Sequence, residues 1–102
     1  MAQIIIYISH PYKGKRANKK DVERIISKLI VEYPEHCFVS PIHTFGNWYK
    51  KVSYEVGMKW CIELLRVCDK MWVFGEYSKS KGCVMEINYC MDNEIDYWIK
   101  QG

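Results

Sequence analysis

The stretch Ile4-Ile5-Ile6-Tyr7-Ile8 decides the fold. Five consecutive β-branched or aromatic residues predict a strand that is covered on both faces, as the strands of parallel sheets are. Three further short runs predict strands of the same sheet, and they lie at residues 37–39, 71–74 and 95–99. The sheet is therefore expected to have about four strands.

The segments between these strands have the apolar spacing of helices. In residues 19–31 one helix face is formed by Val22, Ile25, Ile26, Leu29 and Ile30. Asn18 is expected to cap this helix, with Asp21 in its first turn. A second helix is predicted over residues 53–68, with an inner face formed by Val56, Trp60, Leu64 and Val67 or Cys68. A third is expected to begin at Gly82 and to end near Met91.

Strands that alternate with helices predict an α/β fold, here a flavodoxin- or Rossmann-like three-layer sandwich with helices on both faces of a parallel sheet. The whole chain, residues 1–102, is one domain in this interpretation. With strand order 2-1-3-4, the ligand crevice is expected beyond the carboxyl ends of the first and third strands. Residues 9–14 and 75–82 then border the crevice. Residues 42–51 are rich in aromatic side chains and are predicted to form a functional loop.

The composition argues against several classes of protein. The formal net charge is +3, without a dense basic stripe, which argues against dedicated nucleic-acid binding. No run of about 18 apolar residues is present, so no membrane span is predicted. The first residues also lack the pattern of a signal peptide. The five cysteines form no CxxC pair, so we predict reduced, mostly buried thiols, no metal site and a cytoplasmic location.

Glu86 has unusual neighbours for a carboxylate. On the predicted helix, the residues three and four positions away carry no charge, and they are Gly82, Cys83, Tyr89 and Cys90. A carboxylate held among such groups has a raised proton affinity or a partner that keeps it charged, and both are typical of functional sites. The alternative is that Glu86 only follows the preference of acidic residues for the first turn of a helix.

Residues 78–82, Ser-Lys-Ser-Lys-Gly, directly precede the same helix. Hydroxyl side chains, free backbone N–H groups and a helix N-terminus form an anion site suited to a phosphate, although an ordinary capping loop has the same composition. His10 and His43 fall in loops near the predicted crevice, but two histidines without a third ligand make no metal site, and no cofactor is expected. On the residues alone, Tyr7 fits a core position and Asp69 fits a helix end.

Three segments resemble the nucleoside 2-deoxyribosyltransferase superfamily, in the same order along the chain. Residues 6–12, Ile-Tyr-Ile-Ser-His-Pro-Tyr, are similar to its opening strand and loop. Residues 68–75, Cys-Asp-Lys-Met-Trp-Val-Phe-Gly, are similar to its third strand, which follows an aspartate. Residues 80–87, Ser-Lys-Gly-Cys-Val-Met-Glu-Ile, are similar to the turn that leads to its catalytic glutamate. The pattern resembles that of small, often phage-encoded relatives in particular.

The resemblance implies an N-glycosidase or deoxyribosyltransferase-like enzyme that cleaves the N-glycosidic bond of a nucleotide. By this resemblance, Glu86 is the nucleophile that attacks the anomeric carbon and holds the sugar covalently. Asp69 is expected to position or protonate the base, and Tyr7 to orient Glu86 or contact the sugar. The residues expected to bind the substrate are Ser9, His10, Pro11, Tyr12, His43, Trp48, Gly75, Ser78, Ser80 and Gly82.

Ser80 departs from the transferases of the superfamily, which carry an aspartate six residues before the glutamate. The branch that hydrolyses deoxynucleoside monophosphates has a serine there, so the resemblance implies a nucleoside monophosphate as the preferred substrate. Lys79 and Lys81 favour the same choice. The chain is short for an active transferase, which predicts a homo-oligomer, a dimer or higher. A phage-encoded member acts in the host cytoplasm.

Two other functions are kept as alternatives. The same fold without efficient chemistry could bind and sequester a nucleotide-derived signal, as some phage proteins do. A TIR-like domain that processes NAD or cyclic ADP-ribose also places a catalytic glutamate after a serine and a short apolar run. The base, the sugar and the acceptor stay open at this stage. Trp48 and Tyr49 are candidates for stacking on a base.

Overall fold

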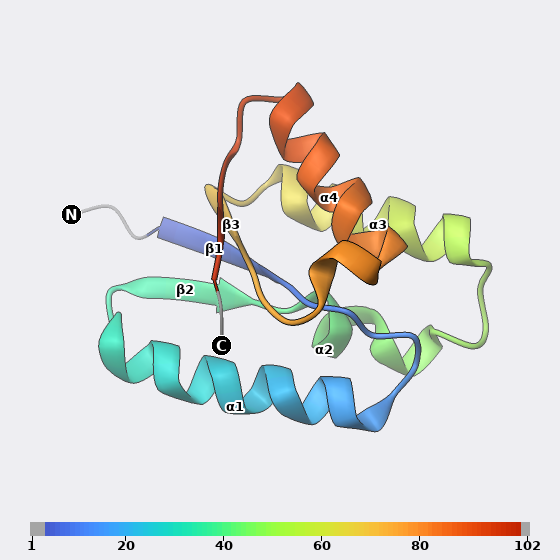
Figure 1. Cartoon of the computed structure of the whole chain (residues 1–102), viewed down its shortest axis with the longest axis horizontal. Helices are drawn as coiled ribbons and strands as arrows, with labels where there is room; N and C mark the ends of the chain where they lie inside the picture. Colours follow the sequence, from blue (N-terminus) through green and yellow to red (C-terminus); the bar gives the residue numbers. More distant parts are fainter. Residues whose placement is uncertain (1–3, 101–102) are drawn as a thin grey trace.

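A four-stranded, all-parallel sheet forms the centre of the protein in a computed structural model that describes residues 4–100 (Figure 1). Its strands are β1 (Ile4–Ser9), β2 (His36–Val39), β3 (Lys70–Val73) and β4 (Asp96–Ile99). The strand order is β2-β1-β3-β4. The predicted α/β class and the predicted order 2-1-3-4 are therefore confirmed.

Helices cover both faces of the sheet (Figure 1). The long helix α1 (Arg16–Glu32) lies on one face, and α3 (Tyr54–Arg66) and α4 (Lys81–Asp92) lie on the other. Three short helical segments join these elements, and they are α2 (Pro41–Phe45), η1 (Gly46–Trp48) and η2 (Tyr77–Lys79). No helix within residues 4–100 combines the length and the apolar composition that crossing a membrane requires.

The alternation of side chains along β1 divides the core into two parts. Ile6 and Ile8 point toward α1 and pack with Val22 and Trp72. Tyr7 points to the opposite face and packs with Leu65 and other residues of the α3–α4 side. A strand with both faces buried reads as the continuous apolar run seen in the sequence.

Helix α1 begins earlier than predicted. Its first helical residue is Arg16, and Lys15 stands at the N-cap position without a side-chain hydrogen bond. The prediction that Asn18 caps this helix is wrong, because its side-chain amide donates to the Tyr12 carbonyl at 2.9 Å from inside the first turn. Asp21 consequently lies in the second turn, where it pairs with His10 and Arg24.

The segment 42–51 is not a plain loop. Ser40 caps α2 by accepting a hydrogen bond from the His43 N–H, and Pro41 occupies the first helical position. A proline there is pre-set for the helical φ angle and lacks only an N–H that the helix does not use. Ser40 and Pro41 therefore start a helix directly after β2, inside the stretch that adjoins the predicted loop.

The inner face of the helix now labelled α3 was predicted only in part, because Leu64 is half-buried against the core but the most buried stripe of the helix is a different one. Its buried residues are Met58 and Leu65, whereas Val56 is 39% and Val67 is 60% exposed. Cys68 is buried, but it follows the end of the helix. Two apolar stripes run along this segment, and packing on the sheet selects the one through Met58 and Leu65.

Candidate functional site

Helix α4 carries Glu86 to the interior at the edge where the strands end. Ser80 caps the helix and accepts a hydrogen bond of 3.2 Å from the Cys83 N–H. Glu86 then falls in the second turn, on the face that packs against β1, and is only 5% exposed. The alternative explanation by a first-turn preference does not apply, because the first turn of α4 contains no acidic residue.

Two hydroxyl groups from β1 donate hydrogen bonds to the Glu86 carboxylate. The Tyr7 hydroxyl donates to Oε2, and the Ser9 hydroxyl donates to Oε1 at 2.7 Å. Tyr7 and Ser9 are two positions apart, so their side chains leave the same face of the strand. Each carboxylate oxygen therefore has its own donor, supplied by a strand that is buried on both faces.

Burial and these two donors act on the Glu86 pKa in opposite directions. Burial raises the pKa from 4.5 to about 7, while the hydrogen bonds from Tyr7 and Ser9 limit the rise. Burial, and next to it the nearby carboxylate, keeps the pKa of Tyr7 well above 10, so its hydroxyl stays a donor. Glu86 is thus poised to exchange its proton near neutral pH.

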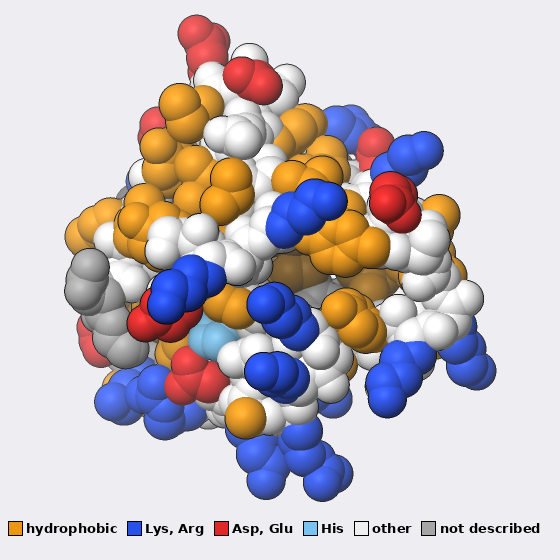
Figure 2. All heavy atoms as spheres, turned by 45° about the vertical axis from the view of Figure 1, so that its right-hand side comes forward, with side chains coloured by type: hydrophobic (Ala, Val, Ile, Leu, Met, Phe, Trp, Pro, Cys, Tyr) orange, Lys and Arg blue, Asp and Glu red, His pale blue; other side chains and the backbone are white. Residues whose placement is uncertain are grey.

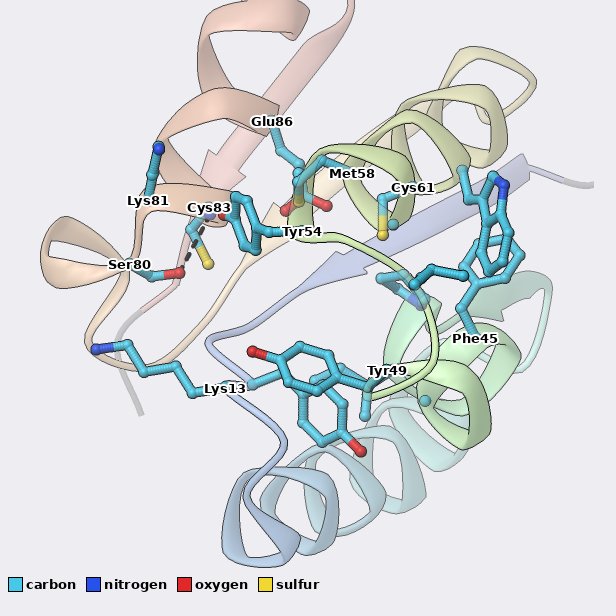
Figure 3. A pocket seen from close by; sticks show the side chains of 18 of the residues that line it. Lys13, Phe45, Tyr49, Tyr54, Met58, Cys61, Ser80, Lys81, Cys83 and Glu86 are labelled. Atoms are coloured by element: carbon cyan, nitrogen blue, oxygen red, sulfur yellow. Dashed lines mark hydrogen bonds between the residues drawn. The ribbon is translucent and has the colours of Figure 1, made fainter.

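A pocket of about 580 Å³ opens in front of Glu86 (Figure 3). It is bounded by the β1–α1 loop, the α2–η1 segment, α3 and the start of α4. In Figure 3 Lys13, Ser80 and Lys81 lie on one side of Glu86, and Cys61 and Phe45 lie on the other. A volume of this size is ordinary for a small-molecule site.

Tyrosines form much of the pocket wall, and glycines make room for them. A Cβ atom on Gly46 would lie 3.1 Å from the Tyr12 hydroxyl, and one on Gly82 would lie 3.1 Å from the Tyr54 hydroxyl. Tyr12 and Tyr49 also meet edge to face, with ring centroids 5.0 Å apart. The pocket therefore offers several aromatic rings to a flat ligand.

Lysine side chains stand at the mouth of this pocket. Lys13 has a φ of 53° and is followed by Gly14 at 69°, a left-handed turn that a residue other than glycine rarely adopts. Lys13 and Lys81 line the pocket and are exposed. Figure 2 shows the hollow with hydrophobic side chains at its floor and Lys or Arg side chains at its rim.

His10 is bonded on both ring nitrogens. Its Nδ1 bonds to the Pro11 carbonyl at 2.7 Å and its Nε2 to Asp21 Oδ2 at 2.7 Å. Hydrogen bonds from Arg24 and then from His10 lower the pKa of Asp21, which keeps the carboxylate charged. His10 thus ties the β1–α1 loop to α1 and leaves no ring nitrogen for another partner.

The predicted catalytic pair of Glu86 and Asp69 is not brought together. Asp69 Oδ2 accepts a hydrogen bond of 2.7 Å from the Ile5 N–H, and the Asp69 N–H donates to the Ile5 carbonyl at 2.8 Å. Asp69 thus flanks the beginning of β1, four residues or about 13 Å before Ser9. The expectation that Asp69 acts on the base is corrected, because the strand direction sends its side chain to the other end of the sheet.

The predicted binding residues fall into two groups. Those that line the pocket or contact Glu86 are Ser9, His10, Tyr12, Ser80 and Gly82. Those that do not line it are Pro11, His43, Trp48, Gly75 and Ser78. His43 is corrected because its ring bonds to Ser40 and Glu23, both at 2.8 Å. Trp48 lines a separate shallow groove, so its predicted stacking role is also corrected.

Several lining residues were not predicted from the sequence as binding residues. They are Lys13, Phe45, Val52, Tyr54, Met58, Trp60 and Cys61, besides Tyr49, which was named only beside Trp48. Tyr54, Met58 and Cys61 are four and three positions apart, so one stripe of α3 faces the pocket. That spacing is visible in the sequence and could have identified them, had the helix phase been right.

The arrangement suits chemistry at an electrophilic carbon. A buried carboxylate with two hydroxyl donors can attack such a centre or exchange a proton with it. Within residues 4–100 no three His, Cys, Asp or Glu side chains are placed to hold a metal ion together. All five cysteines are free thiols, and burial raises the pKa of Cys61 to about 12, so it does not act as a thiolate.

The comparisons with known proteins give a family. A family described as a domain of unknown function (DUF7768) matches residues 4–100. The chain belongs to this family. No curated protein matches it. The DUF7768 match covers every element that builds the pocket, from β1 to α4, so the site described here is part of the family domain.

Proposed function

We propose that this DUF7768 domain is an N-glycosidase or deoxyribosyltransferase-like enzyme that cleaves the N-glycosidic bond of a nucleotide with Glu86 as nucleophile. One observation carries the proposal. The Glu86 carboxylate lies at a pocket, buried, with one hydroxyl donor on each oxygen. A carboxylate so fixed is suited to capture an oxocarbenium-like centre at the sugar C1′ atom.

The charges around the pocket support a phosphorylated substrate. Ser80 caps α4, and free N–H groups at a helix N-terminus favour an anion. Lys13 and Lys81 line the same side, within reach of a 5′-phosphate bound near Ser80. A nucleoside monophosphate is therefore the preferred substrate, with the phosphate at the lysine side and the base toward Phe45.

The chemical step forms a bond between a Glu86 oxygen and C1′ while the C1′–N bond breaks. The electron pair of that bond leaves with the base. Water, or a second base in a transfer reaction, then attacks C1′, loses its proton to solvent and releases Glu86 as a carboxylate, while a base that departed as an anion takes up a proton from solvent. Tyr7 and Ser9 hold the carboxylate in place through both steps.

The test is chromatographic detection of free base. Purified wild-type protein is incubated with nucleosides, nucleoside monophosphates with ribose or deoxyribose, NAD and cyclic ADP-ribose. Glu86→Gln keeps the shape of the side chain and removes the carboxylate, and Glu63→Gln changes an exposed glutamate of α3 outside this pocket. We expect base release by the wild type and Glu63→Gln only. Equal release by Glu86→Gln would reject the mechanism.

A binding protein is the second candidate, and one observation favours it. Burial raises the pKa of Glu86 to about 7, so a share of the molecules carries the protonated, non-nucleophilic form at neutral pH. A protein that holds a nucleotide without cleaving it would retain that nucleotide intact through desalting. Release of the intact nucleotide on denaturation, without free base, would support this candidate over the enzyme.

We further propose that the protein acts in the cytoplasm as a homo-oligomer. Support for self-association comes from apolar side chains on the outer surface of α4, where Val84, Met85 and Met91 are each at least 38% exposed. The molar mass in solution, measured by light scattering after size exclusion, tests it. A mass of one chain across the accessible concentration range would reject the oligomer.

A further inference from the structure

The two sides of the pocket differ in charge and polarity. Lys13, Ser80 and Lys81 form the cationic side. The opposite side is aromatic, with the rings of Phe45 and Trp60 5.5 Å apart. Glu86 lies between these sides, so a ligand that reaches from one to the other passes the carboxylate (Figure 3).

The aromatic side offers a poor supply of protons. Burial, and next to it the Glu86 carboxylate, raises the pKa of Cys61 to about 12 and that of Tyr54 above its ordinary value. His10 has both ring nitrogens bonded, and Asp69 lies at the far end of the sheet. Besides Glu86, the one carboxyl group among the lining residues is that of Glu55, which is exposed in the first turn of α3.

Whether a general acid is present decides which bases can leave from C1′. A neutral base that departs with the electron pair of the glycosidic bond becomes an anion unless an acid protonates it. The absence of such an acid costs about 10²–10⁴-fold in rate. A base whose glycosidic nitrogen belongs to a positively charged ring departs as a neutral molecule and needs no proton.

Resting on the proposed N-glycosidase function, we propose that the substrate is a nucleoside 5′-monophosphate with a cationic base, such as a pyridinium or an N7-alkylpurinium ring. In the step, the Glu86 oxygen bonds to C1′, the C1′–N bond breaks, and its electron pair neutralises the ring. Water then adds to C1′, loses a proton to solvent and releases the Glu86 carboxylate.

The binding forces fit the same class. A cationic ring is attracted to aromatic faces and to a carboxylate, and Phe45, Trp60 and Glu86 provide them. The phosphate of the same molecule is negative and meets Lys13 and Lys81. A zwitterionic nucleotide therefore matches the charge pattern of the pocket better than a neutral base with a phosphate does.

The experiment compares two substrates that differ by one methyl group and one charge. Guanosine 5′-monophosphate and its 7-methyl derivative are used, each as the ribo and the 2′-deoxy form, with nicotinamide mononucleotide as a pyridinium. The methyl group also speeds spontaneous cleavage of the glycosidic bond. The kcat/KM of the 7-methyl nucleotide relative to that of guanosine 5′-monophosphate is therefore divided by the same ratio for their spontaneous cleavage rates in buffer. We expect a quotient of one or more. An enzyme without a general acid should favour the cationic base over the neutral base at least as strongly as the spontaneous reaction does.

The outcomes separate this inference from the function on which it rests. A quotient of about 0.01 or less would overturn the inference, because it means that an acid assists the neutral base. Cleavage of only the neutral nucleotide would overturn the inference and leave the N-glycosidase. Cleavage of no substrate in the broad screen would reject both. Glu55→Gln is the matched variant, and a selective loss of guanosine monophosphate cleavage in it would identify Glu55 as the proton donor and overturn the inference.

Discussion

Ser9 donates a hydrogen bond of 2.7 Å to Oε1 of Glu86, across 77 positions of sequence. The bond joins the last residue of β1 to the second turn of α4, and it is buried. Because Ser9 ends a central strand, its hydroxyl is held by the sheet and not by a loop. The carboxylate is therefore oriented before any ligand arrives, which lowers the entropy cost of the reaction.

Ser9→Ala should move the pH dependence of base release to higher pH. The Ser9 hydrogen bond lowers the pKa of Glu86, so its loss raises that pKa above about 7. A hydrogen bond to a charged group corresponds to a shift of about one pKa unit. The acidic limb of the kcat/KM profile, which follows ionisation of the nucleophile, should move up by that amount.

Ser78→Ala is the matched control for this change, because Ser78 lies in η2 outside the pocket. Its profile should coincide with that of the wild type. An unmoved acidic limb in Ser9→Ala would mean that the profile reports a group other than Glu86.

Glu86→Gln should remove a pH dependence of stability. The folded protein holds a proton on Glu86 up to about pH 7, whereas the unfolded chain releases it near 4.5. Wild-type stability therefore falls as pH rises from about 4.5 to about 7, and no further above that range. The free energy of unfolding of the wild type, minus that of Glu86→Gln, should fall by about 2–3 kcal/mol between pH 5 and pH 8.

Urea unfolding of both proteins at the two pH values measures this difference. Other titrating groups are common to both proteins and cancel. A difference that stays constant, or grows with pH, would show that Glu86 is not held with a raised pKa.

The fold could be predicted because it depends on patterns that lie within short segments. The run from Ile4 to Ile8 is sufficient to identify a strand buried on both faces, and the alternation of strands with helices gives the parallel sheet. The errors arose where two local signals competed. Ser40-Pro41 fits both a strand end and a helix start, and α3 carries two apolar stripes of which packing buries one.

The site was only partly predictable, because its contacts join distant segments. The pairing of Tyr7 with Glu86 spans 79 positions, and only the family resemblance suggested it. Asp69 was placed at the site by the same resemblance, although its position before β3 already puts it at the amino end of a parallel sheet. Ligand sites lie at the carboxyl ends, so strand direction was the better guide.

Gly75→Ala should destabilise the protein. Gly75 has a φ of 75°, and an added Cβ would lie 3.1 Å from both the His10 ring and the Pro11 ring. A left-handed conformation alone costs alanine about 1–2 kcal/mol, and the close contacts add to this. Gly57→Ala is the matched control, because its Cβ would meet only Val52 at 3.9 Å.

Urea unfolding midpoints compare the two variants. Gly57 lies within α3, where alanine favours the helix by about 0.5–1 kcal/mol. The two substitutions should therefore act in opposite directions. A stabilised Gly75→Ala would show that the loop after β3 is free to relax away from His10.

Lys100→Met should loosen the end of β4. The Lys100 ammonium lies 3.9 Å from the ring centroid of Trp98, 4.2 Å from that of Trp72 and 5.4 Å from that of Tyr33. These contacts join the edge strand to the core beside α1, and their loss should cost about 1 kcal/mol of unfolding free energy. Methionine keeps a chain of similar length, and Lys28→Met, on an exposed position of α1, controls for the lost charge. Equal free energies of unfolding of the two variants would show that these contacts contribute no net stability.

Asp69→Ala should lower stability while leaving the reaction intact. Asp69 Oδ2 satisfies the Ile5 N–H at the start of β1, and the exposed position lets water replace part of that bond, so the loss is about 1 kcal/mol. The pocket lies about 13 Å further along the strand and has no contact with this carboxylate. At a temperature where both proteins are fully folded, kcat for base release should equal that of the wild type. A fall in kcat of about 100-fold in the folded variant would identify Asp69 as a catalytic acid. It would also contradict the placement of the reaction at the carboxyl end of the sheet.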